Sequence, residues 1–256
     1  MIEPLVLYFG LVLARVGTFV TVFPLFNQRS LPRLVKIGLA VALTVMYMGH
    51  LVPIAQVPQL LQHSNVSVVA YLFVLGWEVF LGAVMGLAFG LFLVPAQIAG
   101  EFISQGLGLT FGELSTLTGE STTGPLSQIF EGAAILLFFG LDVHHVLLSI
   151  LHASFGFYPI GGAGAELPVQ RLIFGAVAAQ EWGLALAMPV MLCLFTSLLI
   201  LVLMTRAAPQ LNLYSIGFPL QLAVGLTAVL LFAPNLVASM VGTMGKVSEL
   251  LVGSFP

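Results

Sequence analysis

Long apolar runs dominate the chain and are separated by short polar stretches. A helix needs about 20 apolar residues to span a bilayer. The runs that reach this length cover residues 5–26, 34–53, 66–100, 126–154, 172–204 and 214–252. Their apolar positions are continuous rather than alternating, which argues against spanning β-strands. We therefore predict an all-α, polytopic membrane-protein-like fold of five to six long helices, in a single domain over 1–256, with Pro234 able to divide the last helix.

Two of the runs are longer than a simple span requires. Residues 66–100 would extend about 50 Å at ~1.5 Å per residue, against roughly 30 Å for the hydrocarbon core. Residues 172–204 are nearly as long. Tilt, or kinks at Pro95 and Pro189, would absorb the excess length. Alternatively, much of this apolar surface faces protein rather than lipid.

Three glycines in GAVMGLAFG, namely Gly82, Gly86 and Gly90, are spaced four residues apart. They share one helix face and allow another backbone to approach closely. We predict a helix-packing surface there, with the partner helix in the same chain or in another subunit.

The composition places the chain in the membrane class. It has 256 residues, of which 59% are hydrophobic and 7% are charged, whereas soluble domains carry roughly 25% charged residues. The net charge of -3 argues against nucleic acid, and the single Cys193 excludes an intramolecular disulfide. GxSxG, GK[ST], HExxH and CxxC patterns are absent from the sequence, so we expect no catalytic residue and no cofactor.

Five charged residues interrupt the apolar runs: Arg15, Glu78, Glu131, Asp142 and Glu181. A charge at the bilayer centre costs about 3 kcal/mol on insertion scales. Such residues either form a proton or ion path, or are paired structural charges inside an assembly. We favour structural pairs, because the acids are scattered without a repeated pattern.

The stretch LDVHHVLLSILH raises the question of a metal site. His145 and His152 share a helix face with Asp142 nearby, but two helical turns separate the histidines by about 10 Å. That distance is too long for one ion, and His144 is expected to point elsewhere. We therefore expect a polar helix end at an interface and no metal.

Four stretches together resemble the FliR/SctT family of type III secretion export gates. They are PAQIAGEFISQGLGL (95–109), HHVLLSILHASFGFYP (144–159), TRAAPQLNLYSIGFPLQLAVGL (205–226) and FPLFNQRSLPRLVKIGLA (23–40). The resemblance covers essentially the whole chain. The APQLN…GFP motif is its most specific part.

The resemblance implies a non-enzymatic subunit of the flagellar export gate in the bacterial inner membrane, at the basal body. Members assemble with FliP and FliQ and associate with FlhB, and unfolded flagellar subunits pass through the gate. Their helices form a closed spiral around a central pore, largely lifted out of the bilayer. Protein-facing apolar surface would then account for the overlong runs.

The resemblance also implies roles for particular residues. The uncharged-to-acidic stretch GLGLTFGELSTLTGESTTG (106–124) corresponds to a pore plug, although by composition alone it would be an ordinary surface loop. Its plug residues are Gly106, Phe111, Glu113, Leu114, Leu117 and Glu120. The motif residues are Gly100, Glu101 and Gln105 before the plug, and Arg206, Pro209, Gln210, Asn212, Gly217 and Pro219 in a second motif expected to bend and shape subunit packing. Val143 departs from the family, in which glycine is common before the histidine.

Two alternatives stay open at this point. An injectisome homologue belongs to the same family, and Gly217–Pro219 (GFP) looks more flagellar. A secondary transporter would carry matched broken helices in two internal repeats, and we find no such repeat.

Overall fold

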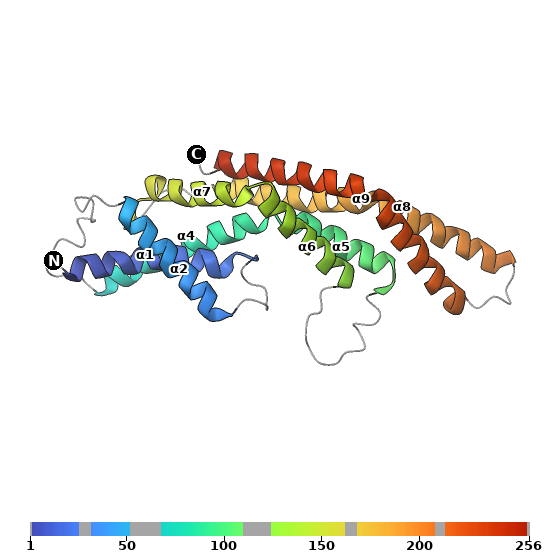
Figure 1. Ribbon diagram of the computed structural model, residues 1–256, viewed down its shortest axis with the longest axis horizontal. Coiled ribbons are helices and arrows are strands. Elements are labelled where there is room, and N and C mark those ends of the chain that lie inside the picture. Colours follow the sequence, from blue (N-terminus) through green and yellow to red (C-terminus); the bar gives the residue numbers. More distant parts are fainter. Residues whose placement is uncertain are drawn as a thin grey trace. The chain divides into compact units, whose positions relative to one another are not determined.

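The computed structural model describes residues 2–25, 32–51, 68–109, 124–161, 168–207 and 213–254. Regular structure in these ranges is helical, which confirms the predicted all-α fold (Figure 1). The helices are α1 (Ile2–Val22), α2 (Arg33–Leu51), α4 (Val68–Gly90), α5 (Val94–Gly106), α6 (Pro125–Gly140), α7 (Val143–Phe157), α8 (Val169–Ala207) and α9 (Leu213–Ser254).

Two of the predicted runs are each divided into two helices. The run 66–100 breaks between α4 and α5, and Pro95 lies in the first turn of α5, where proline costs no backbone hydrogen bond. The run 126–154 breaks between α6 and α7 at Asp142, whose φ of 55° is left-handed. Of the explanations offered for the length of this run, a kink at Pro95 is replaced by a break, since α4 ends at Gly90 and α5 begins at Val94.

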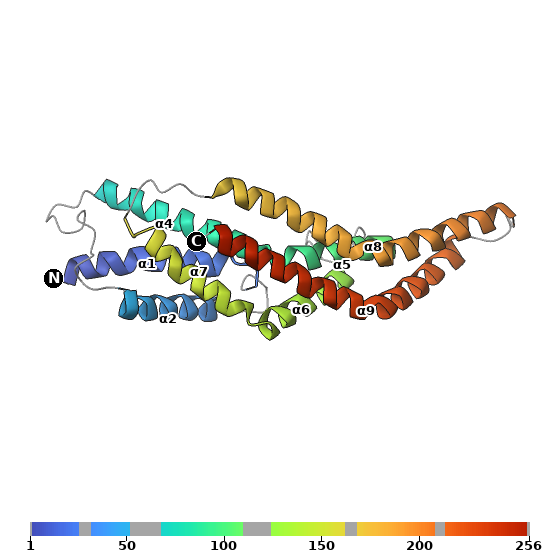
Figure 2. The same cartoon turned by 90° about the horizontal axis from the view of Figure 1, so that it is seen from above.

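The last two helices are long and continuous. The 39 residues of α8 contain Pro189, and the 42 residues of α9 contain Pro219 and Pro234. A division of the last helix at Pro234 therefore does not occur. Figure 2 shows both helices bending along their length, as expected where a proline removes a backbone hydrogen bond.

Four helices are long and apolar enough to cross a membrane. They cover Leu5–Val22, Val68–Gly90, Val169–Ala207 and Gly217–Gly253. The broken pair α6 and α7 makes a fifth span if its two helices count together. Their length and apolar composition indicate that the protein is embedded in a membrane.

The helices group into two compact units. The first unit contains residues 1–90, 142–172 and 249–256, and the second contains residues 91–141 and 173–248. Each unit is thus built from segments that are separate in sequence. The assignment of 1–256 to one domain stays a prediction.

In the first unit, α1 lies between α2 and α4 (Figure 2). The rings of Phe19 and Phe23 on or just beyond α1 pack edge to face on Phe89 of α4. The Tyr47 hydroxyl of α2 donates to the Leu148 carbonyl of α7. In the second unit, α5 packs on α6, and the Phe92 and Phe138 rings meet edge to face.

Candidate functional site

Helix α5 ends at Gly106, in the first of the motifs that the sequence singled out. The Leu107 amide donates to the Ile103 carbonyl at 3.0 Å, and the Gly108 amide donates to the Gln105 carbonyl at 2.9 Å. Gly108 has a φ of 75°, a conformation that glycine adopts without steric cost. The chain therefore leaves α5 through a defined helix cap.

The start of α6 lies against this end of α5. A Cβ added to Gly124 would lie 2.9 Å from Ser104 Oγ and 3.0 Å from Ser104 Cβ, so only glycine fits without movement. Pro125 follows in the first turn of α6. The two ends of the segment 110–123 are thus held side by side. We call the residues that hold them, Ser104, Gly106, Leu107, Gly108 and Gly124, the loop base.

Helix α9 supports the loop base from the second motif. The side-chain amide of Gln221 donates to the Gly106 carbonyl at 2.7 Å, which satisfies one of the carbonyls that a helix end leaves without an intrahelical partner. Gly225 packs against the side chain of Leu107, which is fully buried. The motifs at 95–109 and 205–226 therefore contact each other directly.

Helix α8 packs on the same region. A Cβ at Gly106 would lie 3.0 Å from both Leu194 and Met191 of α8. A Cβ at Gly183 of α8 would lie 2.9 Å from the Pro95 carbonyl oxygen of α5. Close backbone approach of this kind leaves little room for α5 to shift.

Gly100 sets the contact between α5 and α6. A Cβ at this position would lie 2.5 Å from the Ser127 Cα, and the Ser127 hydroxyl donates to the Gln97 carbonyl at 3.2 Å. Glu101 and Gln105, the other residues of this motif, form a hydrogen bond to each other on the exposed side, at 3.2 Å from Gln105 Nε2 to Glu101 Oε1. The five residues of the loop base are uncharged, and Glu101 is the nearby acid on α5.

Several predicted site residues cannot be placed. Phe111, Glu113, Leu114, Leu117 and Glu120 of the plug, and Pro209, Gln210 and Asn212 of the second motif, lie outside the described residues. Arg206 is exposed at the end of α8, Gly217 is buried and Pro219 is exposed within α9. The bend expected at the second motif stays a prediction.

The glycine face of α4 packs on α1 of the same chain. A Cβ at Gly82 would collide with the Arg15 carbonyl oxygen and the Thr18 hydroxyl. A Cβ at Gly86 would lie 3.0 Å from the Phe19 carbonyl oxygen, and one at Gly90 would lie 3.0 Å from Pro24. Of the two partners left open above, the structure places these glycines against a helix within the chain.

A buried ion pair lies beside this glycine face. Arg15 Nε donates to Glu78 Oε2 at 2.6 Å, and the two side chains are 1% and 0% exposed. Arg15 also donates to the carbonyls of Ser154 at 3.2 Å and Tyr158 at 2.8 Å. The Gly161 amide donates to Glu78 Oε1 at 3.3 Å. The pair therefore ties α1, α4 and the end of α7 together.

Arg15 and Glu78 are therefore a structural pair of the kind expected for charges in apolar runs. Asp142 and Glu181 are exposed, and Glu131 is partly exposed. Arg15 and Glu78 are 63 positions apart, so no local spacing could have identified them as partners.

The polar start of α7 differs from what the sequence suggested. Asp142 Oδ1 lies 3.9 Å from His144 Nε2 and 3.9 Å from His145 Nδ1. The expectation that His144 points elsewhere was wrong, because the left-handed Asp142 turns its carboxylate toward both rings. His152 lies away from this group and faces the Tyr47 ring at 6.0 Å between centroids.

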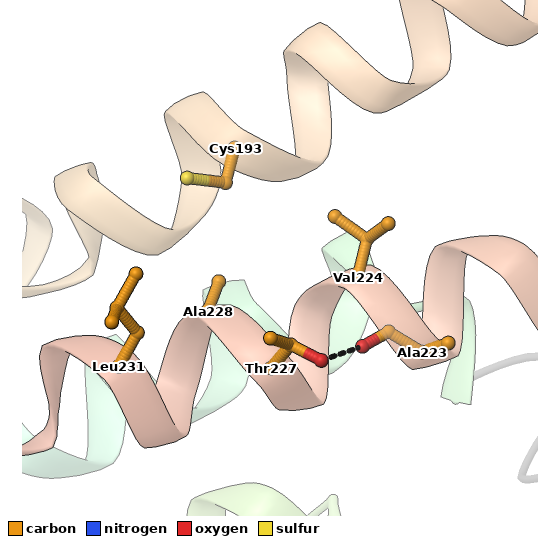
Figure 3. Close-up of a pocket in the computed structure, with 6 residues that line it drawn as sticks. All are labelled: Cys193, Ala223, Val224, Thr227, Ala228 and Leu231. Atoms are coloured by element: carbon orange, nitrogen blue, oxygen red, sulfur yellow. Dashed lines mark hydrogen bonds between the residues drawn. The ribbon is translucent and has the colours of Figure 1, made fainter.

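A shallow pocket of about 350 Å³ opens between α8 and α9 in the second unit. Its lining is apolar except for one hydroxyl and one thiol (Figure 3): Cys193, Ala223, Val224, Thr227, Ala228 and Leu231. The Thr227 hydroxyl donates to the Ala223 carbonyl of its own helix at 2.7 Å. The lining therefore offers little to orient a polar ligand.

Comparison with known proteins identifies the family. A family model described as "Bacterial export proteins, family 1" matches residues 6–247. The chain belongs to this family. It is 32% identical to the flagellar biosynthetic protein FliR of Escherichia coli (strain K12), over 87% of this chain and 82% of the relative. It is 31% identical to the FliR of Pectobacterium carotovorum, over 86% and 82%, and 26% identical to that of Bacillus subtilis (strain 168), over 84% and 82%.

These relatives confirm the resemblance stated from the sequence motifs. The chain is a member of an export-protein family that is not a known enzyme family. In this chain, the motifs at 95–109 and 205–226 meet at the loop base. We take the loop base as the candidate functional site.

Replacing Gln221 with leucine is expected to loosen the loop base by about 1–3 kcal/mol, since the Gly106 carbonyl loses its donor while partly buried. Hydrogen exchange at the last turn of α5 should accelerate accordingly. Gln105→Leu is the matched control, because its hydrogen bond is exposed and worth only about 0.2–0.5 kcal/mol. Equal acceleration in the two variants would contradict a supporting role for Gln221.

Proposed function

We propose that this protein is a non-enzymatic core subunit of the flagellar type III protein export gate. In this proposal it lies in the bacterial inner membrane at the flagellar basal body, and it forms with FliP and FliQ the channel for unfolded flagellar subunits, with FlhB associated. The name and family of its relatives support the flagellar export role. Membrane lipid is its other partner, and neither a cofactor nor nucleic acid takes part.

The exposed apolar surface supports a subunit rather than an isolated chain. The C-terminal part of α8 carries many large, exposed apolar side chains: Leu198, Leu199, Ile200, Val202, Leu203 and Met204. Surface of this kind requires cover by lipid or by protein. In the proposal, neighbouring gate subunits and lipid share that cover.

We further propose that residues 106–124 close the channel as a plug. The observation that carries this proposal is the loop base, where α5, α6, α8 and α9 hold both ends of the segment at one place. The segment between is rich in Ser, Thr and Gly, a composition that favours a conformationally loose backbone. A gate element has to be drawn from the low-stability end of a structure.

Deleting residues 115–122 is expected to leave the gate assembled and to raise ion leakage across the membrane. The deleted residues contain little apolar content, so assembly should not depend on them, whereas the occluding element is shortened. The measurements are co-purification of FliP and FliQ in mild detergent and ion leak in the same strain.

A same-length replacement of 115–122 by Gly and Ser is the matched control, since it keeps the loop length. It should assemble and leak less than the deletion. Normal assembly without added leak in the deletion would show an ordinary surface loop, and failed assembly would show a structural joint. Either result would overturn the plug.

A further inference from the structure

Three metal-ligating side chains gather at the start of α7, well apart in sequence from the loop base. Asp142, His144 and His145 each offer one ligand atom, and these atoms lie within 4.8 Å of one another. The left-handed backbone of Asp142 makes the arrangement, since it folds the carboxylate over the first turn of α7. In a regular helix Asp142 and His145, at i and i+3, would share a face, whereas His144 would lie on another.

The spacing suits an ion better than direct hydrogen bonds. The carboxylate lies 3.9 Å from each imidazole nitrogen, which is beyond hydrogen-bond length. Two ligands that each bind one tetrahedral ion at roughly 2.1 Å lie about 3.4 Å apart. Small side-chain rotations by Asp142 and His145, which are both more than 70% exposed, would close the difference.

The two histidines contribute differently. The Nδ1 atom of His144 is buried, and its ring is 33% exposed, so Nε2 is the nitrogen that it presents to Asp142. Val143, between the Asp and the first His, is buried and anchors the turn. One ligand is therefore held in place by packing, and the two exposed ligands can adjust around an ion.

We propose that Asp142, His144 and His145 bind a divalent transition metal ion of the Zn²⁺ class, with water completing the coordination. Two imidazoles and one carboxylate are ligands that suit Zn²⁺ and its neighbours, whereas Ca²⁺ and Mg²⁺ prefer oxygen ligands alone. The bound ion ties the Asp142 turn to the first turn of α7. From the sequence we expected no metal, because His145 and His152 are far apart and His144 was expected to point elsewhere. The structure instead brings His144 together with Asp142 and His145.

The test is Zn²⁺ titration of the purified full-length chain, carried on a tag without histidine, in competition with a chromophoric chelator. The wild type should bind one ion per chain at this site. Asp142→Asn and His145→Ala should each weaken that binding at least about tenfold, since changes even to groups that only support a ligand cost about 10- to 100-fold.

His152→Ala is the matched control, because His152 is exposed on the same helix and lies outside the cluster. It should retain wild-type affinity. The visible spectrum of bound Co²⁺ gives a second readout, present in wild type and His152→Ala and lost in Asp142→Asn. Wild-type binding no tighter than that of Asp142→Asn, or equal weakening in His152→Ala, would overturn the site.

Discussion

Replacing Glu78 with glutamine is expected to destabilise the protein by about 3–5 kcal/mol, because it leaves the buried Arg15 guanidinium without its counter-charge. The change preserves the size of the side chain, so the loss reports on charge rather than on packing. Thermal unfolding in detergent and the amount of protein in membranes should both fall. Glu181→Gln is the control, since Glu181 is exposed on α8, and it should change neither.

A double variant tests whether the two residues act as a pair. Adding Arg15→Met to Glu78→Gln removes the uncompensated charge, so the double variant should be less destabilised than the sum of the single variants. Additive losses would show that the two side chains are not coupled. Arg15→Met alone should still be costly, because the carbonyls of Ser154 and Tyr158 lose their donor.

Replacing Gly82 with alanine should separate α4 from α1 and cost about 1–3 kcal/mol, the range for overpacking. The added methyl group meets the backbone oxygen of Arg15, which cannot rotate away as a side chain can. The loss should appear as a lower unfolding temperature and as a lower yield of assembled complex on a native gel.

Gly76→Ala is the matched control on the same helix. A Cβ at Gly76 has nothing within 4 Å, and alanine favours a helix over glycine by about 1 kcal/mol. This variant should therefore be neutral or slightly stabilising. If Gly82→Ala behaved like Gly76→Ala, close approach at Gly82 would not contribute to stability.

The apolar runs predicted the helices well but missed two breaks. Leu91, Phe92 and Leu93 form the turn between α4 and α5 and are themselves apolar. The apolar pattern therefore gives no sign that the helix stops there. Pro95 lies just after this break, in the first turn of α5. From the sequence we expected Asp142 to be a paired charge, whereas in the structure its left-handed backbone lies at the break between α6 and α7.

For the candidate site, too, the sequence showed part of the arrangement and not the rest. Both motifs were recognisable in the sequence, but Gln221 and Gly106 are 115 positions apart, and nothing in either motif indicates the other as its contact. The same holds for Arg15 and Glu78. Such pairings depend on how the helices pack, and a single sequence carries no record of that packing.

The ion pair between α1 and α4 has a consequence for biosynthesis. Arg15 precedes Glu78 by 63 residues, and synthesis proceeds at about 5–20 residues per second, so α1 waits about 3–13 s for its counter-charge. During that interval a guanidinium on an otherwise apolar helix has no protein partner from α4. Until α4 leaves the ribosome, insertion of α1 carries the cost of the unpaired charge, about 3 kcal/mol on insertion scales.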